Sequence, residues 1–158
     1  MRYQTAREFF EAAREAARDA DRIRLQLAAM DARSESLGGG GFEPRVRSTP
    51  DPDRMGLRVS ALIDHGDRLR ERQEEDYRLI DAACEVLYGT DNRGGLYALA
   101  GWRADAIYYH YLALRTWQEV GDMLGYTAEH ACREAMAALE LADAWGMTSV
   151  IDGRGNAT

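Results

Sequence analysis

Histidine, cysteine and acidic side chains are the groups in this sequence that could do metal or catalytic chemistry. The three histidines, His65, His110 and His130, are scattered, and none belongs to a His-Glu-x-x-His or Glu-x-x-His motif. Cys84 and Cys132 lack the Cys-x-x-Cys spacing of a zinc or redox site. The sequence has no nucleophile elbow and no kinase or deaminase signature. We therefore expect no metal, no cofactor, no catalytic residues and no enzyme activity.

A different chemistry, hydrogen bonding to DNA, is open to the segment around Gly125. Thr116 and Glu119 have the spacing of a capping box, which predicts the start of a short helix. Gly125 stands where that helix must end, and Thr127 is an N-cap candidate for a second helix. A short helix, a tight turn and a second capped helix form the layout of a helix-turn-helix.

The first turns of the second helix would carry the residues that face DNA. In a helix-turn-helix, the exposed N-terminal part of the second helix lies against base edges in the major groove. Thr127 and the helix N-terminus would lie near phosphate, and Arg115 would contact the DNA backbone. The side chains presented to base edges would be those of Ala128, Glu129, His130 and Arg133.

The segment from Tyr109 to Leu139 resembles the helix-turn-helix of sigma-factor region 4, as found in small phage-encoded transcription regulators. The larger phage family similarly begins with a helical coiled-coil region followed by a loop. This resemblance implies a DNA-binding transcription regulator of a phage or mobile element. The residues that match are Trp117, Val120 and Leu124 on the first helix, Gly125 and Tyr126 in the turn, the cap Thr127, the basic Arg133 and the closing Leu139.

The same segment departs from the family in its charge. Glu134 and Ala137 stand where the resemblance favours an apolar and a basic residue, and Ala131 replaces a larger aliphatic one. The segment from Asp91 to Asp143 contains four arginines and eight acidic residues, which gives it a net charge of -4. Because DNA binding needs positive charge against phosphate, a second copy or RNA polymerase would have to supply it. Alternatively, the same fold serves as a protein-interaction or assembly module, in a packaging or polymerase-contacting protein.

Two long helical patterns must position this module. Apolar or small residues recur at heptad spacing from Thr5 to Arg33, and a second pattern runs from Asp53 to Tyr88. The tract 37–54 between them holds four consecutive glycines and all three prolines, which predicts a long loop. The first seam comprises Phe9, Ala13, Ala16, Ala20, Ile23, Leu27 and Met30; the second comprises Val59, Leu62, Gly66, Leu69, Gln73, Ile80, Cys84 and Leu87.

We therefore expect an all-α fold. A long, coiled-coil-like antiparallel hairpin (residues 1–88) is followed by a helix-turn-helix module (95–146) and a flexible tail (147–158). Helical spacing from Leu96 to Leu114 predicts a helix with a core face, whose tyrosines and tryptophans fit helix packing better than a stacking platform for bases. Gly66, Gln73 and Asp76 would weaken the hairpin seam, so we expect a homo-oligomer, most simply a dimer.

Composition limits the other possibilities. The 158 residues suit about one domain, and 20 arginines without lysine against 27 acids give a net charge of -7, which argues against a generic nucleic-acid binder. Arg45 and Arg47, with Arg54 and Arg58 nearby, form the densest basic cluster, either a solvated loop or a contact to the DNA backbone. The first residues do not resemble a secretory signal and no apolar stretch is long enough to span a membrane, so we expect a cytoplasmic protein.

Overall fold

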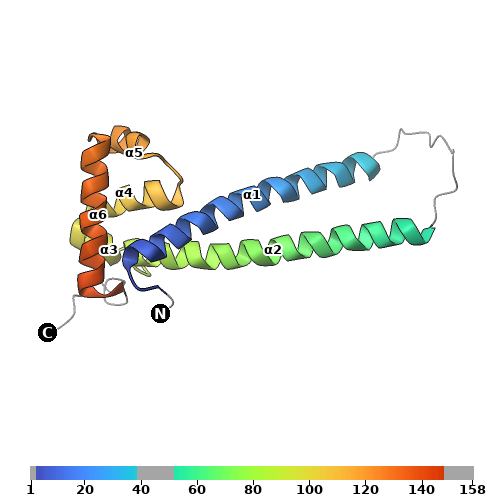
Figure 1. Cartoon of the computed structure of the whole chain (residues 1–158), viewed down its shortest axis with the longest axis horizontal. Coiled ribbons are helices and arrows are strands. Elements are labelled where there is room, and N and C mark those ends of the chain that lie inside the picture. Colours follow the sequence, from blue (N-terminus) through green and yellow to red (C-terminus); the bar gives the residue numbers. More distant parts are fainter. Residues whose placement is uncertain (1–2, 39–51, 148–158) are drawn as a thin grey trace. The chain divides into compact units, whose positions relative to one another are not determined.

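The structure of the chain is a computed structural model that describes the backbone of residues 3–38 and 52–147 and the side chains of residues 3–33 and 56–147. Every regular element in these ranges is helical, which confirms the all-α expectation (Figure 1). The elements are α1 (Ala6–Gly38), α2 (Pro52–Tyr88), α3 (Gly95–Ala100), α4 (Trp102–Ile107), a π-helical turn (Tyr108–Leu112), α5 (Trp117–Leu124) and α6 (Ala128–Trp145).

Both long helices were predicted, but each extends into the tract expected to be a loop. α1 continues to Gly38 and α2 begins at Pro52. The rest of that tract and residues 148–158 of the predicted tail lie outside the described residues. No helix in the described ranges is long and apolar enough to cross a membrane.

The chain divides into two compact units that differ from the predicted domains. Residues 19–75 form the hairpin unit, and residues 1–18 with 76–158 form the core unit. The sequence-based boundary at residue 88 is therefore displaced, because the first turns of α1 and the last turns of α2 pack with the C-terminal helices. Phe10 and Leu87 share one buried cluster with Leu96, Ile107 and Val120.

The hairpin unit holds two antiparallel helical segments. Arg72 donates from Nη2 to both carboxylate oxygens of Asp19, at 2.6 and 2.7 Å, while Gly66 of α2 lies against Met30 of α1. Ile23 and Leu69 are buried between the segments, with 1% and 4% of their surface exposed. These contacts confirm the antiparallel pairing of the two heptad patterns.

The predicted seam of α2 is nevertheless open at its N-terminal end. Val59 and Leu62, which were expected to be buried, are 54% and 56% exposed, and Ile63 is 58% exposed. Past the contact of Met30 with Gly66, α1 continues as Asp-Ala-Arg-Ser-Glu-Ser over residues 31–36. This stretch contains no large apolar side chain; Leu37 follows it within α1, and its side chain lies outside the described residues.

The predicted helix from Leu96 to Leu114 is wrong as a single element. Gly101 adopts φ 62° and ψ -131°, a conformation open essentially only to glycine, and separates α3 from α4. After α4, the amide of Ala113 donates to the carbonyl of Tyr108, five residues earlier, at 3.0 Å. The backbone thus widens into a π-helical turn over the tyrosine run, a change that the spacing of the apolar residues does not reveal.

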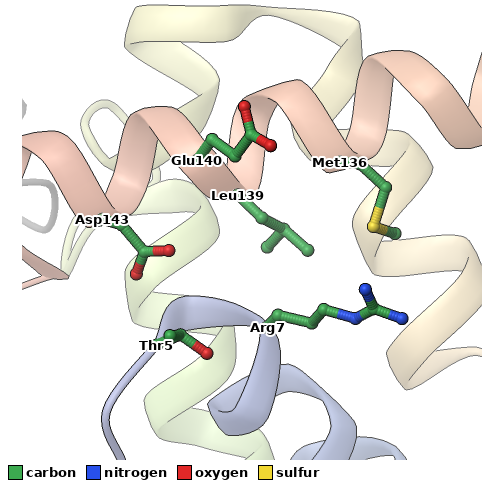
Figure 2. Close-up of a pocket in the computed structure, with 6 residues that line it drawn as sticks. All are labelled: Thr5, Arg7, Met136, Leu139, Glu140 and Asp143. Carbon is green, nitrogen blue, oxygen red and sulfur yellow. The ribbon is translucent and has the colours of Figure 1, made fainter.

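The start of α1 is hydrogen-bonded to α6 within the core unit. The amide of Glu8 donates to Thr5 Oγ1 at 3.1 Å, and the amide of Ala6 donates to Asp143 Oδ1 at 2.6 Å. Figure 2 shows Asp143 on α6 directed toward Thr5, across a cavity of about 230 Å³ that Arg7, Met136, Leu139 and Glu140 also line. A carboxylate at a helix N-terminus is favourable because it accepts from unpaired amides and complements the helix dipole.

Candidate nucleic-acid interface

The capping box predicted at the start of α5 is present. Thr116 Oγ1 accepts from the amide of Glu119 at 3.2 Å, and Glu119 Oε2 accepts from the amide of Thr116 at 3.0 Å. Two amides that would lack helical partners are thereby satisfied. The box fixes where α5 begins and leaves Arg115, one residue earlier, exposed.

Close backbone approach sets the corner between α5 and α6. The amides of Gly125, in the left-handed conformation at φ 80°, and of Tyr126 both donate to the carbonyl of Gly121. Gly121 is buried, and a Cβ placed on it would lie 2.5 Å from the carbonyl oxygen of Tyr126. The chain can turn this tightly only because Gly121 has no side chain.

α6 begins at the N-cap that the sequence predicts. Thr127 Oγ1 accepts from the amide of His130 at 3.2 Å, and the hydroxyl keeps its own proton for another acceptor. Glu129 and Arg133, one turn apart, are exposed on α6, while Ala128 and His130 are partly buried. Of the predicted base-facing residues, Glu129 and Arg133 thus offer the most accessible polar side chains.

An aromatic stack lies beside the first turn of α6. The rings of Trp102 and Tyr126 have centroids 4.3 Å apart and planes at 20°. His130 joins them, with its ring centroid 5.9 Å from Trp102 and 5.0 Å from Tyr126. The sequence placed Trp102 in a core stripe and Tyr126 in the turn, and nothing in their spacing links them, because α4 and the turn meet only through the tertiary fold.

Arg133 is hydrogen-bonded to His130. Its Nη2 lies 3.1 Å from His130 Nδ1. An arginine can only donate, so Nδ1 is the acceptor and the neutral imidazole carries its proton on Nε2. The histidine expected to face base edges therefore also connects the aromatic stack to the one arginine of α6.

The acid next to Arg133 has a different partner. Glu134 Oε2 accepts from Arg103 Nε at 2.5 Å, and this hydrogen bond lowers the pKa of the Glu134 carboxyl. Arg103 also lies 5.4 Å from the ring centroid of Trp102. The position where the resemblance favours an apolar residue is thus occupied by one half of an ion pair between α6 and α4.

His110, which sequence reasoning assigned no role, supports the entry to α5. Its ring stacks on Trp117, and its Nδ1 lies 2.8 Å from the carbonyl oxygen of Arg115. Burial, reinforced by the nearby positive charge of Arg14, lowers the pKa of His110 to about 4. The imidazole is therefore neutral at pH 7, and its Nδ1 proton is donated to the carbonyl of Arg115.

The remaining candidate residues do not extend this site. Arg45 and Arg47 lie outside the described residues. Among the side chains that the structure describes, no group of three or more histidine, cysteine or acidic residues is arranged to hold a metal ion. Comparisons of the chain with known protein families, curated proteins and solved structures found no match.

Proposed function

We propose that this chain is a DNA-binding transcription regulator of a phage or mobile element, which reads DNA with the first turns of α6. The observation that carries the proposal is the tight α5–α6 corner, from which Glu129 and Arg133 project as exposed polar side chains. Helix-turn-helix proteins use this part of the second helix to contact base edges. The resemblance to sigma-factor region 4 favours the same assignment.

Other residues around the corner suit contacts to the DNA backbone. Thr127 has a hydroxyl proton to donate to a phosphate oxygen beside the N-terminus of α6. Arg115 is exposed directly before α5. Ala128 is small enough for close approach to the groove and suits apolar contact with a thymine methyl group.

A second copy of the chain is the partner that we propose for the hairpin unit. Val59, Leu62 and Ile63 continue the heptad face of Gly66 and Leu69, yet each is more than half exposed. A symmetric dimer through this face would bury the apolar side chains that α1 leaves uncovered. Two copies would also double the phosphate contacts of a module with a net charge of -4 and read two half-sites. RNA polymerase is the other partner that we propose as a source of positive charge.

Binding of the full chain to duplex DNA that flanks its gene, measured at low salt, tests the proposal. We expect a complex whose affinity falls as salt rises, because phosphate contacts release counterions. Arg133→Ala should weaken specific binding by about 1–3 kcal/mol without changing the oligomeric state. Arg93→Ala, an exposed arginine outside α5 and α6, is the matched control for loss of one positive charge and should have a smaller effect.

The alternative is a protein-interaction or assembly module with the same fold. The excess of acids over arginines favours it, as do the exposed side chains of Met123 and Tyr126, at 52% and 41%. An assembly module should give no complex with DNA at low salt, whether or not Arg133 is replaced. The same titration therefore separates the two functions.

A further inference from the structure

Arg133 is the only arginine of α6, and its guanidinium is held in place from one side. Its Nη2 is 3.1 Å from His130 Nδ1, which leaves the other donors of the guanidinium available. The side chain is exposed, and the neighbouring Glu134 is bonded to Arg103. The imidazole of His130 thus orients Arg133, while the carboxylate of Glu134 is paired with Arg103 and not with Arg133.

The acceptor is itself fixed. His130 packs against Trp102, which opens α4, and against Tyr126, which belongs to the turn. Trp102 and Tyr126 stack on each other, so α4 and the turn together hold the imidazole. A long arginine side chain loses rotamer freedom when it binds, and this cost is smaller if the bound orientation already exists.

We propose that Arg133 reads a guanine in the major groove and that His130 is the positioning residue that orients its guanidinium. This inference rests on the proposed function and deepens it. A guanidinium has donors and no acceptor, and guanine presents two acceptors, O6 and N7, in the major groove. Adenine presents one acceptor and one donor there, so a fixed pair of arginine donors selects guanine.

Selection from a pool of duplexes with a randomised central segment, using the full-length chain, tests the inference. The wild-type chain should enrich a motif with guanine at one position of each half-site. Arg133→Ala should lose the preference at that position, about tenfold or more, and keep the preferences elsewhere in the motif. Replacement of that guanine by 7-deazaguanine removes the N7 acceptor and should weaken wild-type binding but not binding by Arg133→Ala.

Two replacements of His130 separate positioning from packing. His130→Phe keeps a ring against Trp102 and Tyr126 but has no acceptor, whereas His130→Gln keeps an acceptor without the ring. His130→Phe should reduce the guanine preference several-fold at that single position, with an unchanged helical circular dichroism spectrum. A purely structural role would instead weaken binding evenly across the motif.

The outcomes that would overturn the inference differ from those that would overturn the function. A motif whose guanine preference persists in Arg133→Ala, or is as strong in His130→Phe as in wild type, overturns the inference alone. Failure of the wild-type chain to enrich any motif overturns the proposed function and the inference with it.

Discussion

The imidazole of His110 and the indole of Trp117 are stacked, with ring centroids 3.8 Å apart and planes at 15°. His110 belongs to the π-helical turn and Trp117 is the first residue of α5, so the stack spans the junction that precedes the helix-turn-helix. Arg14 of α1 donates to the backbone carbonyl of His110. The start of α5 is therefore held by Arg14 of α1 together with His110 and Trp117.

Stability should depend on pH through His110. Its pKa is lowered from 6.5 to about 4 in the folded chain. As the pH falls below about 6.5, the unfolded chain therefore binds a proton that the folded chain does not. The contribution of neutral His110 to the free energy of unfolding is complete above about pH 6.5 and declines as the pH falls toward 4. We expect the Tm to fall between pH 7.5 and 5, and to fall less in His110→Phe, which keeps a ring on Trp117 without a titratable group.

The comparison between these two chains isolates His110, because His65, His130 and all carboxylates are common to both. The midpoints can be followed by circular dichroism at 222 nm in buffers of equal ionic strength. Equal slopes of Tm against pH in the wild type and in His110→Phe would contradict the assignment.

The α5–α6 corner should not tolerate a side chain at residue 121. In Gly121→Ala, the new Cβ would lie 2.5 Å from the carbonyl oxygen of Tyr126 and 3.0 Å from the carbonyl carbon of Thr127, so the backbone must shift. We expect a loss of about 1–3 kcal/mol in the free energy of unfolding. Gly56→Ala is the control, because its Cβ would meet nothing within 4 Å, and alanine favours a helix by up to about 1 kcal/mol. Equal free energies of unfolding for Gly121→Ala and Gly56→Ala in denaturant titration would disprove the close approach of the backbone to Gly121.

Asp143 should stabilise the start of α1. Asp143→Ala removes the acceptor for the amide of Ala6 and should cost about 1 kcal/mol, as loss of an N-cap does. Asp143→Asn keeps an oxygen acceptor but not the charge, so its cost should be smaller. Glu140→Ala is the matched control, since this carboxylate lines the same cavity but points away from the start of α1 in Figure 2. A Glu140→Ala effect as large as that of Asp143→Ala would refute the capping role.

The exposed face of α2 should control self-association. The double variant Leu62→Gln/Ile63→Gln should shift the mass measured by light scattering from that of a dimer to that of one chain, with little loss of helicity. Leu57→Gln removes a leucine that is 71% exposed on the other side of α2, at 100° per residue, and should leave the dimer intact. A wild-type chain that is monomeric at micromolar concentration would exclude the proposed dimer.

Local signals in the sequence were sufficient for the elements around the candidate site. The capping box at Thr116 and Glu119 and the N-cap at Thr127 act between residues three apart, so their spacing alone predicted where α5 and α6 begin. The heptad pattern likewise predicted α1 and α2, because a period of three and four residues places one face of a helix in contact with a partner.

The same periodicity failed where the backbone changed without changing the spacing of apolar residues. Gly101 ends α3, although the apolar residues on either side of it keep helical spacing. The π-helical turn adds one residue per turn within the tyrosine run, where a large aromatic side chain fits a core face in either helix type. Val59 and Leu62 match the heptad seam, but their burial depends on the partner residues of α1, and residues 31–36 of α1 are small, polar or charged.

The sequence by itself determined the helical class, the two long helices and the capped α5–α6 corner, because propensity, heptad spacing and capping are interactions between near neighbours along the chain. Only the tertiary structure decided that Trp102 stacks on Tyr126 and His130, that Glu134 pairs with Arg103, and that Asp143 caps α1. These contacts join residues separated by many positions, and their partners are selected by the packing of whole helices, which no local pattern encodes.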